Sequence, residues 1–244
     1  IEPDEFDHGR TRNDGIMASN ADYCLLMTQD AVPADELLVE KLLECFSADD
    51  VAVAYARQLP DEDCRIIERL ARNFNYPEES CIKYKKDIDS MGIKAFFCSD
   101  VCAMYDRKKY IEQGGFIKKT IFNEDMIYAA KVIENEQKVY YNAKARVIHS
   151  HNYNSAQQFH RNFDMAVSQA QHPEIFRKVS SEKEGMKLIK NTVAFLIKQR
   201  RPWLVFKLFT DCVAKYAGYL LGRKYQKLPK KIVLKCTMNP RYWT

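Results

Sequence analysis

Hydrophobic residues in the first part of the chain recur with the spacings of strands and of a helix. The apolar run Tyr23–Met27 predicts a short buried strand, and Asp30 follows almost directly at its carboxyl end. Residues Val51–Arg57 alternate with a period of two and predict a second strand. The segment between these strands predicts a helix with Asp35 as its N-cap, because its apolar residues have helical spacing: Leu37, Leu38, Leu42, Leu43 and Phe46.

The remaining pattern alternates in the same way until the last third of the chain. Residues 8–21 predict a turn that enters a short helix, and residues 58–94 read as an irregular, charged excursion with short helical pieces. Lys94–Arg107 predicts a strand or a strand pair, and Gly114–Phe116 predicts a turn. We further expect a helix over Asn123–Gln137, capped by Asn123, and a final strand over Lys138–His151. Mostly helical sequence follows Ser155, so we predict an α/β domain with a C-terminal helical appendage.

Charge is distributed unevenly over the two parts. From Lys183 to Thr244 the sequence holds 15 lysines and arginines against 2 acidic residues, although the whole chain has a net charge of only +5. A basic tail of this kind predicts a polyanionic partner, either a membrane surface or a nucleic acid. The 8 cysteines include no C-x-x-C pair, so we expect reduced thiols, with Cys98 and Cys102 buried for structural reasons.

The segment Trp203–Gly222 has the length of a membrane span, but its charges argue against one. Lys207, Asp211 and Lys215 recur every fourth residue and form one polar stripe on an otherwise apolar helix. Such a helix can lie in the membrane interface, or it can pack on the catalytic domain and show its lysines to solvent. We favour membrane contact. The tail lacks the interleaved aromatics that stack on single-stranded bases, which argues against nucleic acid.

Three groups of polar residues lie at the ends of predicted strands or at the start of a predicted helix, where functional residues are often found. They are Asp30 after the first strand, Glu124-Asp125 at a helix start, and His149 with His151 after the last strand. The carboxyl ends of strands meet at one sheet edge, where Asp30 and a histidine would suit Mg²⁺ or Mn²⁺, with Asp125 nearby as general base. Each also has an ordinary explanation: a turn cap before Pro33, a favourable first-turn charge, and histidines held by hydrogen bonds.

The order of these elements closely resembles the family-2 glycosyltransferases of the GT-A fold. The resemblance rests on "FDHGRTRNDG", "LLMTQDAVP", "YARQLP", "GGF…FNEDMIYAAKV" and "VIHSHNYNSAQQFHRNFD", and it covers most of residues 4–170. Within the family, the chain is similar to the rhamnosyltransferases that build bacterial surface polysaccharides. The resemblance implies an inverting transfer from a nucleotide-diphospho-sugar, with a Rossmann-like mixed sheet.

The resemblance also implies roles for individual residues. Asp30 corresponds to the last carboxylate of the family's D-x-D metal motif, and His149 to a C-terminal metal or diphosphate ligand, with His151 as the alternative. Asp125 takes the place of the base, and Glu124 would orient it or touch the acceptor. The segment that faces the donor diphosphate supplies Arg12 and Asn13, with Arg10 as a weaker candidate. Asp100 stands where the family has Asn, which leaves its acceptor contacts open.

The chain departs from the family at its start, where a β-α-β unit that holds the nucleotide base would precede Ile1. We therefore expect residues 1–155 to form an N-terminally truncated GT-A core and residues 156–244 to form a basic, membrane-associated helical region. We expect the 244-residue chain by itself to be self-associated and inactive. The predicted enzyme moves rhamnose from dTDP-rhamnose to a lipid-linked acceptor at the inner face of a bacterial cytoplasmic membrane. Two alternatives remain open: a UDP-hexose donor, and a non-catalytic remnant that binds membrane or nucleic acid.

Overall fold

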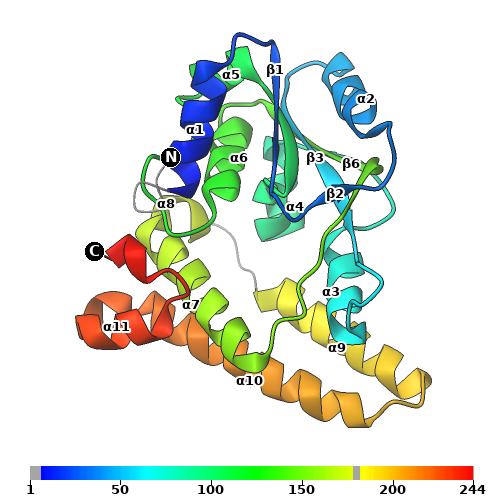
Figure 1. Cartoon of the computed structure of the whole chain (residues 1–244), viewed down its shortest axis with the longest axis vertical. Coiled ribbons are helices and arrows are strands. Elements are labelled where there is room, and N and C mark those ends of the chain that lie inside the picture. The colour runs from blue at the N-terminus through cyan, green and yellow to red at the C-terminus, as the bar shows by residue number, and fades with distance from the viewer. Residues whose placement is uncertain (1–6, 178–181, 244) are drawn as a thin grey trace. The chain divides into compact units, whose positions relative to one another are not determined.

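The computed structural model describes residues 7–177 and 182–243, with the side chains of residues 182 and 183 excluded. The chain divides into two compact units, each considered by itself (Figure 1). We call Gly9–Lys118 with Glu124–His151 the sheet unit. The helical unit contains Lys119–Asn123 and the region from Asn152 onward.

A six-stranded mixed sheet forms the centre of the sheet unit. Its strand order is β1-β5-β3-β6-β2, and β4 also pairs with β6. The strands are β1 (Tyr23–Met27), β2 (Val32–Pro33), β3 (Val51–Leu59), β4 (Cys81–Lys83), β5 (Cys102–Asp106) and β6 (Lys138–Ile148). The central strands β3 and β6 are parallel, whereas β5 runs antiparallel to β3 and to β1. The expected mixed α/β class is therefore confirmed.

The first strand has the predicted bounds, but the prediction that it is buried is wrong. Within the part of the chain that the structure describes, β1 pairs with β5 alone and is an edge strand. Its end residues Tyr23 and Met27 are 39% and 38% exposed, whereas Val51–Ala56 of β3 are buried on both faces. A continuous apolar run identifies a strand, but its place in the sheet depends on pairings distant in sequence.

The sheet unit contains one helix before the first strand and further helices in the connections between strands. They are α1 (His8–Ala18, which begins at the unit boundary), α2 (Leu38–Leu43), α3 (Ile66–Asn75), α4 (Ile88–Met91), α5 (Arg107–Glu112) and α6 (Glu124–Glu134). Short 3-10 turns span Glu44–Ser47, Lys85–Asp87 and Gly92–Phe96. The region 58–94 is thus more regular than predicted, because α3 is a ten-residue helix and β4 joins the sheet.

Two predicted helix caps are corrected by the structure. Asp35 lies too far before α2 to be its N-cap; its carboxylate accepts from the Leu37 N–H and pairs with Lys41 and Arg146. Asn123 has a φ of 65°, in the left-handed region, whereas an N-cap residue normally has extended backbone. Its side-chain amide donates instead to the Met165 carbonyl.

Only the last part of the predicted strand region Lys94–Arg107 is a strand. The buried ammonium group of Lys83 donates to the carbonyls of Lys94 and Phe97, and the chain between them turns as a 3-10 helix. A local propensity for strand is overridden here by contacts from β4. The Gly114–Phe116 turn is confirmed, with positive φ at both glycines. Cys98 and Cys102 are buried free thiols, as predicted.

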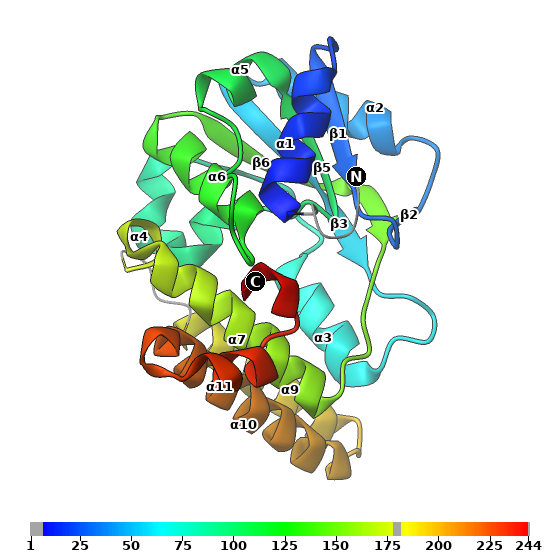
Figure 2. The same cartoon turned by 60° about the vertical axis from the view of Figure 1, so that its left-hand side comes forward.

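The helical unit is built on α7 (Ser155–Gln171) and α10 (Trp203–Arg223), two long helices that lie side by side (Figures 1 and 2). Its helices are α7 (Ser155–Gln171), α8 (Pro173–Phe176), α9 (Glu182–Lys198), α10 (Trp203–Arg223) and α11 (Lys230–Cys236), with 3-10 turns at Tyr225–Lys227 and Pro240–Trp243. A Cβ atom on Gly218 would lie 2.2 Å from the Phe159 carbonyl oxygen, so only glycine allows α10 to approach α7 this closely.

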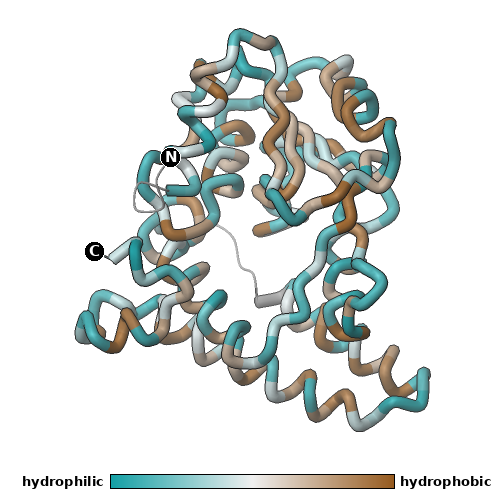
Figure 3. The backbone as a smooth tube through the Cα atoms, in the orientation of Figure 1, coloured by the Kyte–Doolittle hydropathy of each residue, from teal (hydrophilic) through white to brown (hydrophobic). Residues whose placement is uncertain are grey.

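The side chains of α10 are arranged opposite to those of an ordinary packed helix. Asp211 is only 8% exposed; it accepts from the Ser155 hydroxyl at 2.7 Å and pairs with Lys207. Hydrophobic residues recur along α10 (Figure 3), and many of the large ones are exposed. We call these exposed residues the α10 face: Trp203, Phe206, Phe209, Val213, Tyr216 and Leu220. Of the polar stripe, Asp211 is thus buried, whereas the Lys207 side chain stays 39% exposed.

None of the helices in the described ranges has the combination of length and apolarity that a membrane crossing requires. This agrees with the interpretation of the charged residues within Trp203–Gly222.

Candidate functional site

Strand directions bring four polar residues to one edge of the sheet. The carboxyl ends of β1, β3 and β6 lie at this edge together with the start of β5, because β5 is antiparallel to its neighbours. Asp30 follows β1, Gln58 lies near the end of β3, Asp100 precedes β5, and His149 follows β6. The predicted meeting of Asp30 with His149 is therefore confirmed by the topology.

Asp30, His149 and His151 form a compact cluster at this edge. The Nε2 atoms of both histidines lie 3.5 Å from Asp30 Oδ2, and the two imidazole rings are 4.6 Å apart in an edge-to-face arrangement. His149 is buried, whereas Asp30 is half exposed. One ligand atom from each residue lies within 4.8 Å of the others. The cluster thus has an open side toward solvent.

This geometry fits a single divalent cation. Two ligand atoms that each lie about 2.1 Å from one ion are about 3 to 4 Å apart, so small side-chain movements would close the cluster around it. Partial burial acts to raise the pKa of Asp30, but the Thr28 hydroxyl and the His149 imidazole outweigh it and hold the pKa below its usual value. The carboxylate is therefore ionised at neutral pH, as a ligand must be.

A second cluster contains the acidic residues at the start of α6. The Asp100 N–H donates to Asp125 Oδ2 at 3.2 Å, and the Met126 N–H donates to the other oxygen at 2.7 Å. Asp125 is partly open to solvent, whereas Glu124 and Asp100 are buried. The carboxylate of Asp125 is thus held by two backbone donors while it stays accessible.

Arg12 and Tyr105 hold the two buried carboxylates. The Arg12 guanidinium forms an ion pair with Glu124 and lies 3.4 Å from Asp100 Oδ2 through Nε. The Tyr105 hydroxyl donates to the other oxygen of Asp100. Arg12 therefore connects both acidic side chains that flank Asp125.

The electrostatics of this cluster make Asp125 more basic than an ordinary carboxylate. Burial, followed by the negative charges of Glu124 and Asp100, raises the pKa of Asp125 well above its ordinary value. The two backbone N–H groups act in the opposite direction but do not cancel the effect. Burial also raises the pKa of Asp100, against the opposing charge of Arg12. A carboxylate with a raised pKa is a stronger proton acceptor than an ordinary one.

The predicted diphosphate-binding residues lie at different places on α1. Arg12 faces the carboxylates, and Asn13 Oδ1 accepts from the Tyr110 hydroxyl at 3.1 Å. A Cβ atom on Gly115 would lie 2.4 Å from the same oxygen, so the Gly114–Phe116 turn packs directly on Asn13. Arg10 is exposed. Contacts of these three residues with a diphosphate remain a prediction.

Comparisons with known proteins identify the family of the chain. The profile described as "Glycosyl transferase family 2" matches residues 2–114. The whole chain is 40% identical over 245 residues to the O-antigen chain rhamnosyltransferase WbaN of Salmonella anatum, and covers 78% of that protein. It is 39% identical to the O-antigen chain rhamnosyltransferase RfbN of Salmonella typhimurium strain LT2, again over the whole chain and 78% of that protein.

The chain belongs to glycosyl transferase family 2. A similar solved structure is the mannosyltransferase PcManGT from Pyrobaculum calidifontis in complex with GDP-Man and Mn²⁺. It is 13% identical, with a TM-score of 0.47, over 98% of this chain and 63% of that one. The family match and the two rhamnosyltransferase relatives confirm the resemblance found in the sequence, and the protein is a glycosyltransferase.

The structure of this glycosyltransferase adds residues to the edge that the sequence motifs did not single out. Gln58 contacts His149, and Arg72 of α3 contacts Gln58. The signal for Gln58 was a polar residue near the end of an apolar strand, which is costly to bury unless its hydrogen bonds are satisfied. Tyr105 gave no such signal, because a tyrosine in a strand usually packs as an aromatic.

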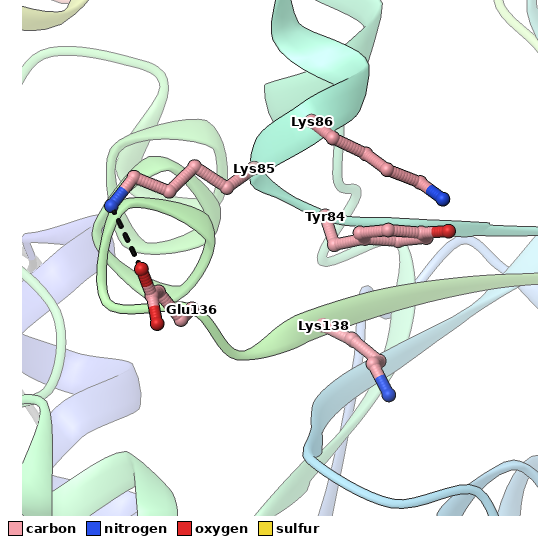
Figure 4. A pocket seen from close by; sticks show the side chains of 5 residues that line it. All are labelled: Tyr84, Lys85, Lys86, Glu136 and Lys138. Carbon is pink, nitrogen blue, oxygen red and sulfur yellow. Dashed lines mark hydrogen bonds and ion pairs between the residues drawn. The ribbon is translucent and has the colours of Figure 1, made fainter.

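A hollow elsewhere in the sheet unit is separate from this edge. It has a volume of about 430 Å³ and is lined by Tyr84, Lys85, Lys86, Glu136 and Lys138 (Figure 4). Lys138 begins β6, whereas His149 follows its other end. The lining residues contact one another, because Lys85 pairs with Glu136 and the Lys86 ammonium group lies over the Tyr84 ring.

Proposed function

We propose that this glycosyltransferase moves rhamnose from dTDP-rhamnose to a hydroxyl of a growing, lipid-linked polysaccharide, with inversion at the anomeric carbon. The two rhamnosyltransferases that align with the whole chain support the sugar and the type of product. The observation that carries the reaction type is Asp125, a carboxylate that two backbone N–H groups hold at an accessible position of the sheet edge.

In the proposed step, Asp125 accepts the proton of the acceptor hydroxyl while that oxygen attacks the anomeric carbon. The bond from this carbon to the diphosphate oxygen breaks, and the nucleoside diphosphate leaves with the electron pair. Attack from the face opposite the leaving group inverts the configuration. The raised pKa of Asp125 favours the proton transfer. Glu124, fixed by Arg12, would orient the base or touch the acceptor.

The donor diphosphate would lie at the other cluster. Asp30 and His149, with His151 beside them, would hold a divalent cation. Two imidazoles with one carboxylate suit Mn²⁺ better than Mg²⁺, which prefers oxygen ligands. When bound there, the cation supplies positive charge beside the diphosphate oxygens that leave with the nucleotide. Arg12, Asn13 and Arg10 would contact the same diphosphate.

The helical unit supports attachment to the inner face of the cytoplasmic membrane, where a lipid-linked acceptor would be found. The α10 face exposes aromatic and aliphatic side chains over the length of one helix. Exposed cations flank both ends of this face: Arg200 and Arg201 precede α10, Arg223 is its last residue, and Lys224 follows it. Apolar side chains bordered by cations are typical of helices that lie in an anionic membrane surface.

A transfer assay with the full-length enzyme and a lipid-linked saccharide acceptor tests this function. We expect product from dTDP-rhamnose and little from UDP-hexoses, with the inverted anomer identified by NMR. Asp125→Asn should lower turnover by at least about 100-fold while donor affinity changes little, because the amide keeps the shape of the base and cannot accept the proton.

Asp89→Asn serves as a matched control, because Asp89 is exposed on α4. Its turnover should equal that of the unmodified chain. Transfer from a UDP-hexose in preference to dTDP-rhamnose would overturn the donor assignment. Normal turnover of Asp125→Asn would remove Asp125 from the mechanism.

A further inference from the structure

Gln58 forms a buried polar junction behind the proposed cation site. Its side chain is 2% exposed at the end of β3, and both ends of its amide have partners. The oxygen Oε1 meets Arg72 Nη1 and lies 3.0 Å from His149 Nδ1. The nitrogen Nε2 donates to the Tyr76 hydroxyl at 2.6 Å and to the Ser99 hydroxyl at 2.9 Å.

The chemistry of these partners determines which way the amide points. A guanidinium group only donates hydrogen bonds, so the end of Gln58 that faces Arg72 must be the oxygen. The other end faces two hydroxyl groups, and each of them can accept from the amide nitrogen. Arg72 is itself held, because its Nη2 atom pairs with Glu68 at 2.6 Å one helical turn earlier. The amide orientation therefore follows from Arg72.

The same logic extends to the tautomer of His149. An amide oxygen can only accept, so His149 Nδ1 must carry the proton of this hydrogen bond. In the neutral ring, Nε2 then has the free lone pair, and Nε2 is the atom 3.5 Å from Asp30 Oδ2. A lone pair and a carboxylate oxygen repel each other at this distance unless a positive charge lies between them. A cation bound to both atoms supplies that charge.

We propose that Arg72 and Gln58 are positioning residues that fix the Nδ1–H tautomer of His149 and present its Nε2 atom to the divalent cation. This inference rests on the proposed cation site of the transferase. Neither residue touches the cation; they act through His149, as partners of metal-bound histidines commonly do. The His151 ring is more exposed than the His149 ring.

The tautomer can be read directly by NMR. In metal-free protein with ¹⁵N-labelled histidine, the two ring nitrogens give different shifts when one is protonated. We expect His149, assigned by comparison with His149→Asn, to show a protonated Nδ1 and an unprotonated Nε2 at a pH where the ring is neutral. A protonated Nε2 in the neutral ring would overturn the proposal without any variant at Gln58.

Mn²⁺ affinity, followed by electron paramagnetic resonance of the free ion, provides the second readout. Gln58→Leu removes the acceptor and should weaken Mn²⁺ binding by about 10- to 100-fold. Gln58→Glu keeps an acceptor for both His149 and Arg72, so it should retain affinity within a few-fold. Asn142→Leu is the matched control, because Asn142 is a buried amide on β6 whose partners are Lys41 and Cys45. It should leave Mn²⁺ affinity unchanged.

Thermal unfolding identifies variants that do not fold. If Gln58→Leu fails to fold, Arg72→Met decides, because it leaves the amide in place and removes the donor that orients it; we expect weaker Mn²⁺ binding. Unchanged affinity in a folded Gln58→Leu or Arg72→Met variant would overturn the proposal. Neither readout depends on sugar transfer, so failure of the donor assignment and failure of the histidine relay give different results.

Discussion

Helices α6 and α10 differ in which of their residues are buried. In α6 the apolar side chains from Met126 to Ile133 are buried, and the acidic residues of its first turn lie at the site. In α10 the polar residue Asp211 is buried, while Phe206 is 73% exposed on the α10 face. Both helices bury acidic groups only beside specific partners: Arg12 for Glu124, and Lys207 with Ser155 for Asp211.

The difference between the two helices matches the two proposed roles, catalysis beside α6 and membrane attachment through the α10 face. A buried carboxylate is costly unless it is paired, so the partners at α6 mark a place where charge is required. An exposed row of large apolar side chains marks a surface that something else covers. Helical spacing shows that a stripe exists, but it does not show which side of the helix faces inward.

Charged substitutions on the α10 face test the attachment half of this comparison. Phe206→Glu combined with Phe209→Glu should weaken binding to vesicles of phosphatidylcholine and phosphatidylglycerol by roughly tenfold or more. Two aromatic side chains lose their burial in the bilayer, and two negative charges are added near an anionic surface. Vesicle flotation measures the bound fraction.

Val39→Glu combined with Ile111→Glu is the matched control, since both residues are exposed apolar side chains of the sheet unit. It should leave vesicle binding unchanged. Equal binding of the Phe206 and Phe209 variant would show that the α10 face is not the membrane surface. Binding of the unmodified chain should also fall with added salt, because flanking cations contribute.

Asp100 offers a smaller test of the catalytic half. Asp125 accepts a proton only when it is ionised, so kcat/KM should rise with pH through the raised pKa of Asp125. Asp100→Asn removes one of the negative charges that raise this pKa, so the rising limb should move to lower pH. Below the wild-type limb, relative activity should increase roughly threefold or more. The asparagine oxygen still accepts from Tyr105, which preserves the local contact.

The pH profile of Asp89→Asn should coincide with that of the unmodified chain, since this exposed residue lies outside the cluster. A limb that stays in place in Asp100→Asn, or moves to higher pH, would mean that Asp100 does not set the basicity of Asp125.

The main strands, the helix that follows Asn123 and the meeting of Asp30 with His149 could be predicted because they depend on local pattern and strand direction. Asp30 and His149 follow strands whose carboxyl ends share one edge, so their meeting follows from topology. Edge position, caps and turns could not be predicted in the same way. Lys83 turns the backbone after Gly92 through contacts between distant segments, and the Asn123 amide is used by Met165.

Gln58 is a site residue whose role could not be predicted from the sequence. Its position in an apolar strand marks it as unusual, but the orientation of its amide follows only from Arg72 on another element. The burial of Asp211 likewise depends on Ser155, which lies 56 residues earlier in the chain. The surroundings of both polar groups therefore depend on hydrogen bonds between residues that are distant in the sequence.

Asp30→Ala tests most directly the proposal that the polar edge of the sheet holds a cation for the donor diphosphate. Calorimetric titration with dTDP, with and without Mn²⁺, should show Mn²⁺-dependent nucleotide affinity reduced by at least roughly tenfold, because a ligand is lost. Affinity without Mn²⁺ and thermal stability should change little, since Asp30 is half exposed. Unchanged Mn²⁺-dependent affinity together with lower thermal stability would contradict the claim and leave Asp30 as a turn cap before Pro33.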